Sequence, residues 1–303
     1  MKGRVGIVGL GIMGGAISRN LVQAGWEVHG FDPDPAQSAR AAANGVSIAQ
    51  DAASLIDAAP IVLASLPSAK AAEATAEAIA ASGAEPRVLV ELSTLALADK
   101  TRVKEIVERA GHRAIDCPIS GTGAQAEKKD LVLYASGESA AIAEVRPVLE
   151  DFSRAVHDVG GFGNGSRMKF VANLLVAIHN VASAEAMVLG MKAGLDPRQV
   201  FELVAAGAGT SRVFELRAPM MAEGRYRPAT MKVGIWQKDM AVIGAFAAAL
   251  ECPVPLFAAS APIYAAAMAN GHADDDTAAV CAVLETMAGS PRRGATGKDK
   301  DKD

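Results

Sequence analysis

The sequence predicts an α/β domain followed by an all-helical domain. Short runs of β-branched residues alternate with alanine-rich helical stretches up to about residue 160, and no convincing strand follows. Such alternation implies a mostly parallel sheet covered by helices on both faces. The glycine-dense stretch 160–166 separates the two halves. We therefore expect domains at 1–162 and 163–289, joined by a long helix, and a disordered tail at 290–303, which lacks large apolar residues.

The individual elements follow from the spacing of apolar residues. Strands are expected at 4–8, 27–31, 61–65, 87–92, 113–116, 131–135 and 155–159. Helices between them are expected at 13–24, 35–43, 69–81 and 99–110. In the second half, helices are expected at 167–192, 197–206, 212–222, 231–250, 255–270 and 275–287. There, Gly194 is typical of a helix end, and Asp196 followed by Pro197 is typical of the next helix start.

Composition excludes several classes of protein. Half of the 303 residues are hydrophobic and 21% are charged, as in globular proteins of about two domains. A net charge of −4 and 4% aromatic residues disfavour nucleic acid and anionic lipid as partners. Three cysteines without a CxxC pair form neither a disulfide framework nor a zinc site, and no other cluster suggests a metal. No uninterrupted apolar run reaches about eighteen residues, so we expect no membrane span and a cytoplasmic location.

A glycine motif lies between the first expected strand and the first expected helix. The motif consists of Gly9, Leu10, Gly11, Ile12, Met13 and Gly14. In this context GxGxxG is typical of a Rossmann domain, in which the helix N-terminus binds a pyrophosphate. Asp32 ends the second strand and is followed by Pro33 rather than by an arginine, which favours NAD over NADP. The alternatives are ordinary glycine-rich turns and an aspartate that caps a helix.

A second motif follows the strand at 113–116, where open α/β sheets bind ligands. Ser120 offers a hydroxyl group, and the glycines beside Thr122 expose backbone amides to a substrate carboxylate. The alternative is a flexible loop without a ligand. Cys117 is expected to be a packed residue rather than a nucleophile, because no histidine lies nearby in the sequence.

A third motif begins the long helix of the second half. Lys169 and Asn173 are four residues apart, so they share one face of that helix. A lysine in an otherwise apolar helix beside a glycine-rich hinge is a candidate general acid/base, since burial favours the neutral amine that can accept a proton. The alternative is a solvated lysine on a helix surface.

These blocks, in this order, resemble the β-hydroxyacid dehydrogenase family, which includes 3-hydroxyisobutyrate, tartronate semialdehyde and threonate enzymes. The resemblance covers residues 3–288 and includes a Lys-Asp pair at 238–239 followed by Pro-Val-Pro at 253–255. It implies a Rossmann domain like that of 6-phosphogluconate dehydrogenase and an NAD-dependent enzyme.

The resemblance also implies roles for individual residues. Lys169 would be the catalytic lysine. Ser120, Gly121 and Thr122 would bind the substrate carboxylate, with help from Asn173.

For the cofactor, the resemblance implies that Leu66, Pro67 and Thr94 line the cleft and that Lys238 closes over it. Read without the family, Lys238 is a solvated helical charge and Thr94 a helix-capping residue.

The implied reaction transfers hydride between nicotinamide and a small 3-hydroxy acid, in a homodimer or homotetramer. The loop reads Ser-Gly-Thr where the family usually has Ser-Gly-Gly, so the substrate could be 3-hydroxyisobutyrate-like or polyhydroxylated, such as threonate. Two alternatives remain. One is an imine reductase, a related class that has another residue at the position of Lys169. The other is a non-catalytic NAD-binding scaffold, which would also be expected to lack the lysine.

Overall fold

A computed structural model describes residues 2–83 and 85–290 of the chain. Its contacts divide the chain into two compact units, Met1–Val171 and Ala172–Asp303, which we call the first and the second unit. The division falls inside one continuous helix, α8 (Asn164–Lys192). The tail expected to be disordered lies outside the described residues except for Ser290.

The first unit contains a six-stranded parallel sheet and a small second sheet. The large sheet has the order β3-β2-β1-β4-β5-β6 and consists of β1 (Arg4–Val8), β2 (Glu27–Phe31), β3 (Ser47–Ile48), β4 (Ile61–Ala64), β5 (Val88–Glu91) and β6 (Arg113–Asp116). The small sheet consists of β7 (Ile119–Ser120), β8 (Val132–Ala135) and β9 (Ala155–Asp158). The expected strands at 131–135 and 155–159 therefore exist, but they pair with each other rather than extend the large sheet.

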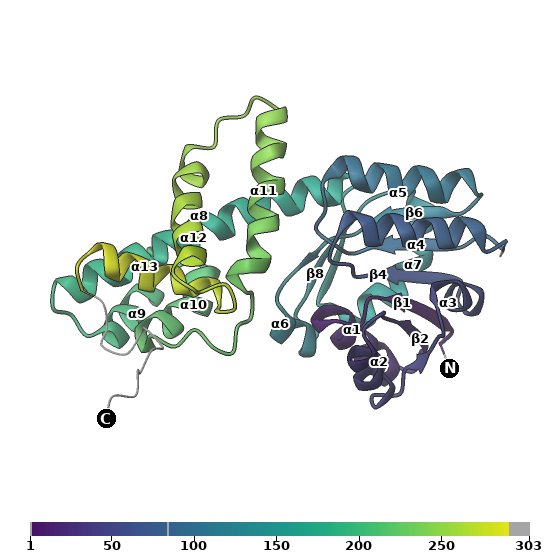
Figure 1. The fold of residues 1–303 in the computed structure, drawn as a ribbon, viewed down its shortest axis with the longest axis horizontal. Coiled ribbons are helices and arrows are strands. Elements are labelled where there is room, and N and C mark those ends of the chain that lie inside the picture. Colours follow the sequence, from purple (N-terminus) through teal and green to yellow (C-terminus); the bar gives the residue numbers. More distant parts are fainter. Residues whose placement is uncertain (1, 84, 291–303) are drawn as a thin grey trace. The chain divides into compact units, whose positions relative to one another are not determined.

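Helices cover both faces of the large sheet, which confirms the expected α/β architecture. The helices of this unit are α1 (Ile12–Gln23), α2 (Pro35–Ala42), α3 (Ala52–Ala58), α4 (Ala69–Ala81), α5 (Leu97–Arg109), α6 (Gly123–Glu127) and α7 (Ser139–Phe152). On β4, Leu63 packs into the apolar cluster of α1 and α7, and Val62 into that of α3, α4 and α5. Figure 1 shows α4 and α5 side by side on one face. The elements β3, α3, β7, α6 and α7 were not expected from the sequence.

Between residues 172 and 290 the structure describes helices and no strand, as expected. After α8 come α9 (Pro197–Ala205), α10 (Arg212–Glu223), α11 (Val233–Ala249), α12 (Pro255–Ala269), the 3-10 helix η1 (Thr277–Ala279) and α13 (Val280–Met287). Gly194 has a φ of +83° after α8, and Asp196 caps α9, so both predicted boundaries are confirmed. The helix expected at 275–287 is present from Thr277 to Met287, and its first turn is the 3-10 turn η1, which the Asp276 side chain caps.

Helix α8 has 29 residues, and its most apolar window has a mean hydropathy of 1.6. By length and composition alone it is able to cross a membrane, but core helices of globular proteins pass the same test. It carries the buried polar side chains of Lys169, Asn173 and Asn180, which are typical of a helix packed inside protein. The expectation that the chain has no membrane segment stays a prediction.

Candidate active site

The glycine loop, residues 9–14, joins β1 to α1 and has the geometry of a dinucleotide-binding turn. Gly9 has a φ of +90°, and a Cβ atom there would overlap the carbonyl oxygen of Ser65. A Cβ atom on Gly14 would overlap the carbonyl oxygen of Gly9. At Gly11, by contrast, a Cβ atom would meet nothing within 4 Å. The loop is therefore tight where backbone segments cross and open where a pyrophosphate would approach the N-terminus of α1, so these residues fit the cofactor.

Asp32 is connected to the glycine loop. Its Oδ2 atom accepts a hydrogen bond from the backbone N–H of Leu10 at 2.7 Å, and its Oδ1 atom accepts one from the N–H of Asp34 at 2.9 Å. The side chain that caps α2 is Asp34, so the alternative that Asp32 is a capping residue is wrong. The half-buried carboxylate lies at the end of β2, where an adenosine ribose binds in folds of this type.

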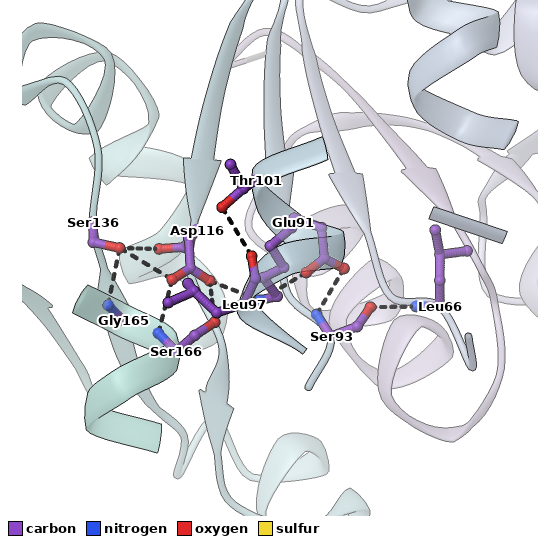
Figure 2. A network of polar contacts seen from close by, with 10 residues as sticks. Leu66, Glu91, Ser93, Leu97, Thr101, Asp116, Ser136, Gly165 and Ser166 are labelled. Carbon is purple, nitrogen blue, oxygen red and sulfur yellow. Dashed lines mark hydrogen bonds and ion pairs between the residues drawn. The ribbon is translucent and has the colours of Figure 1, made fainter. Parts of the chain in front are cut away.

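The loops that follow β4 and β5 meet at the carboxyl ends of these strands. The hydroxyl group of Ser93 accepts a hydrogen bond from the N–H of Leu66 at 2.8 Å, which Figure 2 shows. Thr94 follows Ser93 and is half-buried, and Pro67 next to Leu66 is exposed. The cap of α5 is Ala96, so Thr94 is not the helix-capping residue of the alternative interpretation. The three residues expected to line the cofactor cleft thus lie in two adjacent loops.

Residues 120–123 form the loop expected to bind a substrate carboxylate. Gly121 has a φ of +143°, and a Cβ atom there would lie 2.6 Å from the side chain of Leu131. Thr122 precedes α6, and its N–H donates to Oε1 of Gln125 at 3.0 Å. The Thr122 hydroxyl group lies 3.4 Å from the same oxygen. The loop therefore has a conformation fixed by its own contacts, and Ser120 is half-buried at its start.

Loop 120–123 lies beside the glycine loop. A Cβ atom on Gly123 would overlap the side chain of Ile12 in the glycine loop. Further along the two helices, the side-chain amide of Asn20 donates to the carbonyl oxygen of Ala126 at 2.8 Å, in the buried contact between α1 and α6. A small group held by loop 120–123 is therefore close to the place where the pyrophosphate would bind.

The first turn of α8 packs against the end of β6. A Cβ atom on Gly165 would overlap the carbonyl oxygen of Tyr134 and lie 2.9 Å from that of Asp116. The N–H of Ser166 donates to Oδ2 of Asp116 at 2.7 Å. Lys169, three residues further along the helix, is 7% exposed, so the alternative of a solvated lysine is wrong. The start of α8 is thus fixed to the segment that leads into loop 120–123.

In the second unit, Asn173 is bound by the carboxylate of Asp239, a contact that the sequence does not predict. Its side-chain amide donates to Oδ2 of Asp239 at 2.9 Å, and Lys238 lies 3.5 Å from the other carboxylate oxygen. Asp239 is buried and Lys238 is 38% exposed. The sequence feature that could have identified Asp239 is its position directly after Lys238, in the Lys-Asp pair.

Two further expectations concern reactive groups. Cys117 is fully buried, and burial and the neighbouring Asp116 charge raise the pKa of its thiol, which confirms that it is a packed residue. Among residues 2–83 and 85–290, no group of three or more His, Cys, Asp or Glu side chains is placed to hold a metal ion.

Comparisons with known proteins agree with this geometry. Residues 4–161 match the NAD binding domain of 6-phosphogluconate dehydrogenase, and residues 163–284 match a domain described as the NAD-binding of NADP-dependent 3-hydroxyisobutyrate dehydrogenase. The L-threonate dehydrogenase of Cupriavidus necator is 31% identical over 94% of this chain and 97% of that protein.

Solved structures give the same result. The 3-hydroxyisobutyrate dehydrogenase of Mycobacterium tuberculosis with L-serine is 30% identical, with a TM-score of 0.85 over 94% of this chain and 99% of that one. An imine reductase from Myxococcus stipitatus is 17% identical over 94% of this chain and all of that one, and its TM-score of 0.62 indicates a shared fold alone. Because one family model spans more than half of the sequence and a full-length relative exceeds 30% identity, the chain belongs to the β-hydroxyacid dehydrogenase family of NAD(P)-dependent oxidoreductases.

Proposed function

We propose that this chain is an NAD-dependent dehydrogenase of a small 3-hydroxy acid, with Lys169 as its general acid/base. The observation that carries the proposal is the arrangement of three segments in the first unit. Loop 120–123 lies against the glycine loop, and the first turn of α8 packs against the strand end that leads into loop 120–123. The loop that we propose for the carboxylate, the turn that we propose for the cofactor and the helix turn that precedes Lys169 thus belong to neighbouring segments.

Ser120 and Gly121 would orient the substrate. The Thr122 N–H already donates to Gln125, so the donors for a carboxylate are the Ser120 hydroxyl group and the Gly121 N–H. The Thr122 side chain would then contact the rest of the substrate. Anchoring at one end converts an encounter of two reactants into an oriented complex.

Lys169 would handle the proton of the reaction. The bound nicotinamide supplies a hydride acceptor in one direction and a hydride donor in the other. The Nζ atom of Lys169 would take the proton from the substrate hydroxyl group during oxidation and return it to the forming hydroxyl during reduction. Burial of Lys169 supports this role, because it keeps bulk water from competing for that proton.

NAD is the proposed cofactor, and NADP is the less favoured one. The Asp32 carboxylate would accept hydrogen bonds from ribose hydroxyl groups and repel a 2′-phosphate. An arginine would be needed to offset that repulsion. On α2, Arg40 is exposed and its Nε atom donates to the carbonyl oxygen of Ala36 in its own helix at 3.2 Å.

The test is a turnover panel. Hydroxy acids of about three to five carbons are oxidised with NAD or NADP, and cyclic imines are reduced with NADH or NADPH. Turnover of a 3-hydroxy acid supports the proposal. Turnover of imines alone would identify the imine reductase alternative, and NADH binding without any turnover would identify a scaffold. Lys169 argues against both alternatives.

We also propose a homodimer or homotetramer. Met168, Val171 and Leu175 lie at helical spacing on α8 and are 40%, 52% and 47% exposed. An apolar stripe on one face of a helix is typical of a surface that packs on another element. The mass in solution, measured by light scattering, tests this. The cytoplasmic location stays a prediction from the sequence.

A further inference from the structure

A lysine is completely buried between two strand ends of the large sheet. The Nζ atom of Lys100 on α5 lies 2.7 Å from Oε2 of Glu91 and 2.7 Å from Oδ1 of Asp116. The three side chains are 0%, 2% and 0% exposed. Burial alone would lower the pKa of Lys100, but the charges of Asp116 and Glu91 outweigh burial and raise it. Lys100 is therefore charged at neutral pH, and the cluster carries a net charge of −1.

Glu91 connects this cluster to the cofactor side of the sheet. Its Oε1 atom accepts a hydrogen bond from the N–H of Ser93 at 3.0 Å. The hydroxyl group of Ser93 accepts the bond from the N–H of Leu66 described above. In Figure 2, Glu91, Ser93 and Leu66 follow one another from left to right along this path. One end of the network thus lies in a loop expected to line the cofactor cleft.

Asp116 connects the cluster to the start of α8. Besides the Ser166 N–H, its carboxylate accepts a hydrogen bond from the Ser166 hydroxyl group at 2.8 Å and one from the Ser136 hydroxyl group at 3.2 Å. The oxygen of Ser136 accepts the N–H of Gly165 at 2.9 Å. The excess negative charge of the cluster therefore faces the N-terminus of a helix, where a negative charge is favoured. Lys169 lies one turn further along the same helix.

We propose that Lys100 is a positioning residue that fixes the first turn of α8, and with it Lys169, relative to the cofactor loop after β4. Without the ammonium group of Lys100, the carboxylates of Glu91 and Asp116 repel each other. Of these two carboxylates it is Asp116 that binds α8, so a displaced Asp116 would displace the first turn of that helix. The backbones of Glu91 and Asp116 are already neighbours in the large sheet, where the N–H of Cys117 donates to the carbonyl oxygen of Glu91 at 2.9 Å. The ion pairs of Lys100 add a link between the two side chains. This inference rests on the proposed function for the role of Lys169, but the mechanical link from Leu66 to Ser166 does not depend on it.

The matched variants separate positioning from simple neutralisation of charge. Lys100→Met leaves two carboxylates in the core and is expected to fold poorly. Lys100→Met with Glu91→Gln restores the net charge of −1 but lacks the bridge. Ser166→Ala keeps the cluster and removes only the hydroxyl bond to Asp116. Arg109→Met removes a positive charge from the exposed end of the same helix α5 and serves as the control.

For the double variant we expect a kcat at least ~100-fold below wild type, with the NADH dissociation constant and the substrate KM within about threefold, because the reacting groups are misplaced rather than lost. Ser166→Ala should lower kcat by about tenfold, and Arg109→Met should not change it. A double variant that folds with wild-type kcat overturns the proposal. If the double variant does not fold, the kcat of Ser166→Ala tests the proposal instead. A wild-type kcat in Ser166→Ala then overturns the proposal.

Hydrogen exchange gives a readout that does not need turnover. In wild type, NADH binding should slow amide exchange over residues 164–170. In the double variant the free protein should exchange there at least about tenfold faster, with a weaker response to NADH. Equal exchange in both proteins overturns the proposal. If wild type oxidises no hydroxy acid, the proposed function fails while this measurement still decides the role of Lys100.

Discussion

The backbone N–H of Leu10 donates a hydrogen bond of 2.7 Å to the carboxylate of Asp32. The bond fixes the end of β2 to the first turn of the glycine loop. Because one carboxylate oxygen is held by this bond and the other by the N–H of Asp34, the negative charge has a defined place beside the expected ribose site. A charge held in place discriminates between ligands more strongly than a mobile one.

We predict that the wild type prefers NAD over NADP by at least ~100-fold in kcat/KM, because a 2′-phosphate would meet the Asp32 carboxylate. Asp32→Asn with Pro33→Arg should shift the ratio toward NADP by at least about tenfold. The control is Asp34→Asn, which removes a neighbouring carboxylate that caps α2. The argument is contradicted if the wild type already prefers NADP. It is also contradicted if Asp34→Asn shifts the ratio of kcat/KM values with NAD and NADP as far as the Asp32 and Pro33 substitutions do.

Lys169→Met should reduce turnover at least ~100-fold, the low end of general acid–base contributions. The methionine keeps roughly the volume of the lysine stem and removes the titrating group, so NADH affinity should change little. Lys192→Met, at the exposed last turn of the same helix, is the control and should keep full turnover. Steady-state kinetics and NADH titration are the measurements, and a variant with more than about a tenth of wild-type turnover excludes the catalytic role.

The sequence predicted the elements that carry a local signal. The strand, glycine turn and helix around Gly11 have fixed chemistry and spacing, so their boundaries agree with the structure within a residue or two. The sequence does not predict helix α7, although its large apolar residues are buried, because Pro147 interrupts its helical pattern. Pairings between distant residues have no local signal. Nothing in the sequence connects Asn173 to Asp239, and Lys100 looks like an ordinary surface lysine of a charged helix.

Asp276 provides a pH-dependent test of stability in the second unit. Burial alone would raise its pKa, but the Arg217 charge and hydrogen bonds from Ala278 and Thr230 outweigh burial and lower it. A carboxyl group with a lowered folded-state pKa stabilises the protein above its unfolded pKa and loses this contribution as pH falls through the folded value. Asp276→Asn should therefore cost about 3 kcal/mol at pH 7, since it leaves the buried Arg217 without its carboxylate.

The stability difference between wild type and Asp276→Asn, measured by urea unfolding, should be the same at pH 7 and about pH 5.5 and should narrow below the ordinary carboxyl pKa of 3.8. Asp274→Asn is the control, because the pKa of Asp274 is also lowered by Lys232 but the group is exposed. Asp274→Asn should not measurably change the free energy of unfolding at pH 7. If the stability difference between wild type and Asp276→Asn does not depend on pH, the charge of Asp276 is not what stabilises the fold.

Thr122 replaces the glycine that the family usually has, and its hydroxyl group lies 3.4 Å from Gln125. At that distance the hydroxyl is only weakly held, so it can turn to a hydroxyl group of a substrate. A methyl group in a pocket discriminates by only ~1–3 kcal/mol, whereas a buried hydroxyl that must be paired discriminates more strongly. We therefore predict a preference for a threonate-like acid over 3-hydroxyisobutyrate.

Thr122→Val keeps the volume and removes the hydroxyl group, so it should lower kcat/KM for the polyhydroxylated acid at least ~10-fold more than for 3-hydroxyisobutyrate. Thr122→Gly should reduce the preference for the threonate-like acid over 3-hydroxyisobutyrate. Gln125→Met removes the partner of Thr122 in the α6 cap and leaves the hydroxyl in place. If Thr122 serves only that cap, then Gln125→Met and Thr122→Val will lower kcat/KM for both acids alike. If instead the ratio changes only in the Thr122 variants, the hydroxyl group faces the substrate, because the loss of the cap alone leaves the pocket chemistry intact.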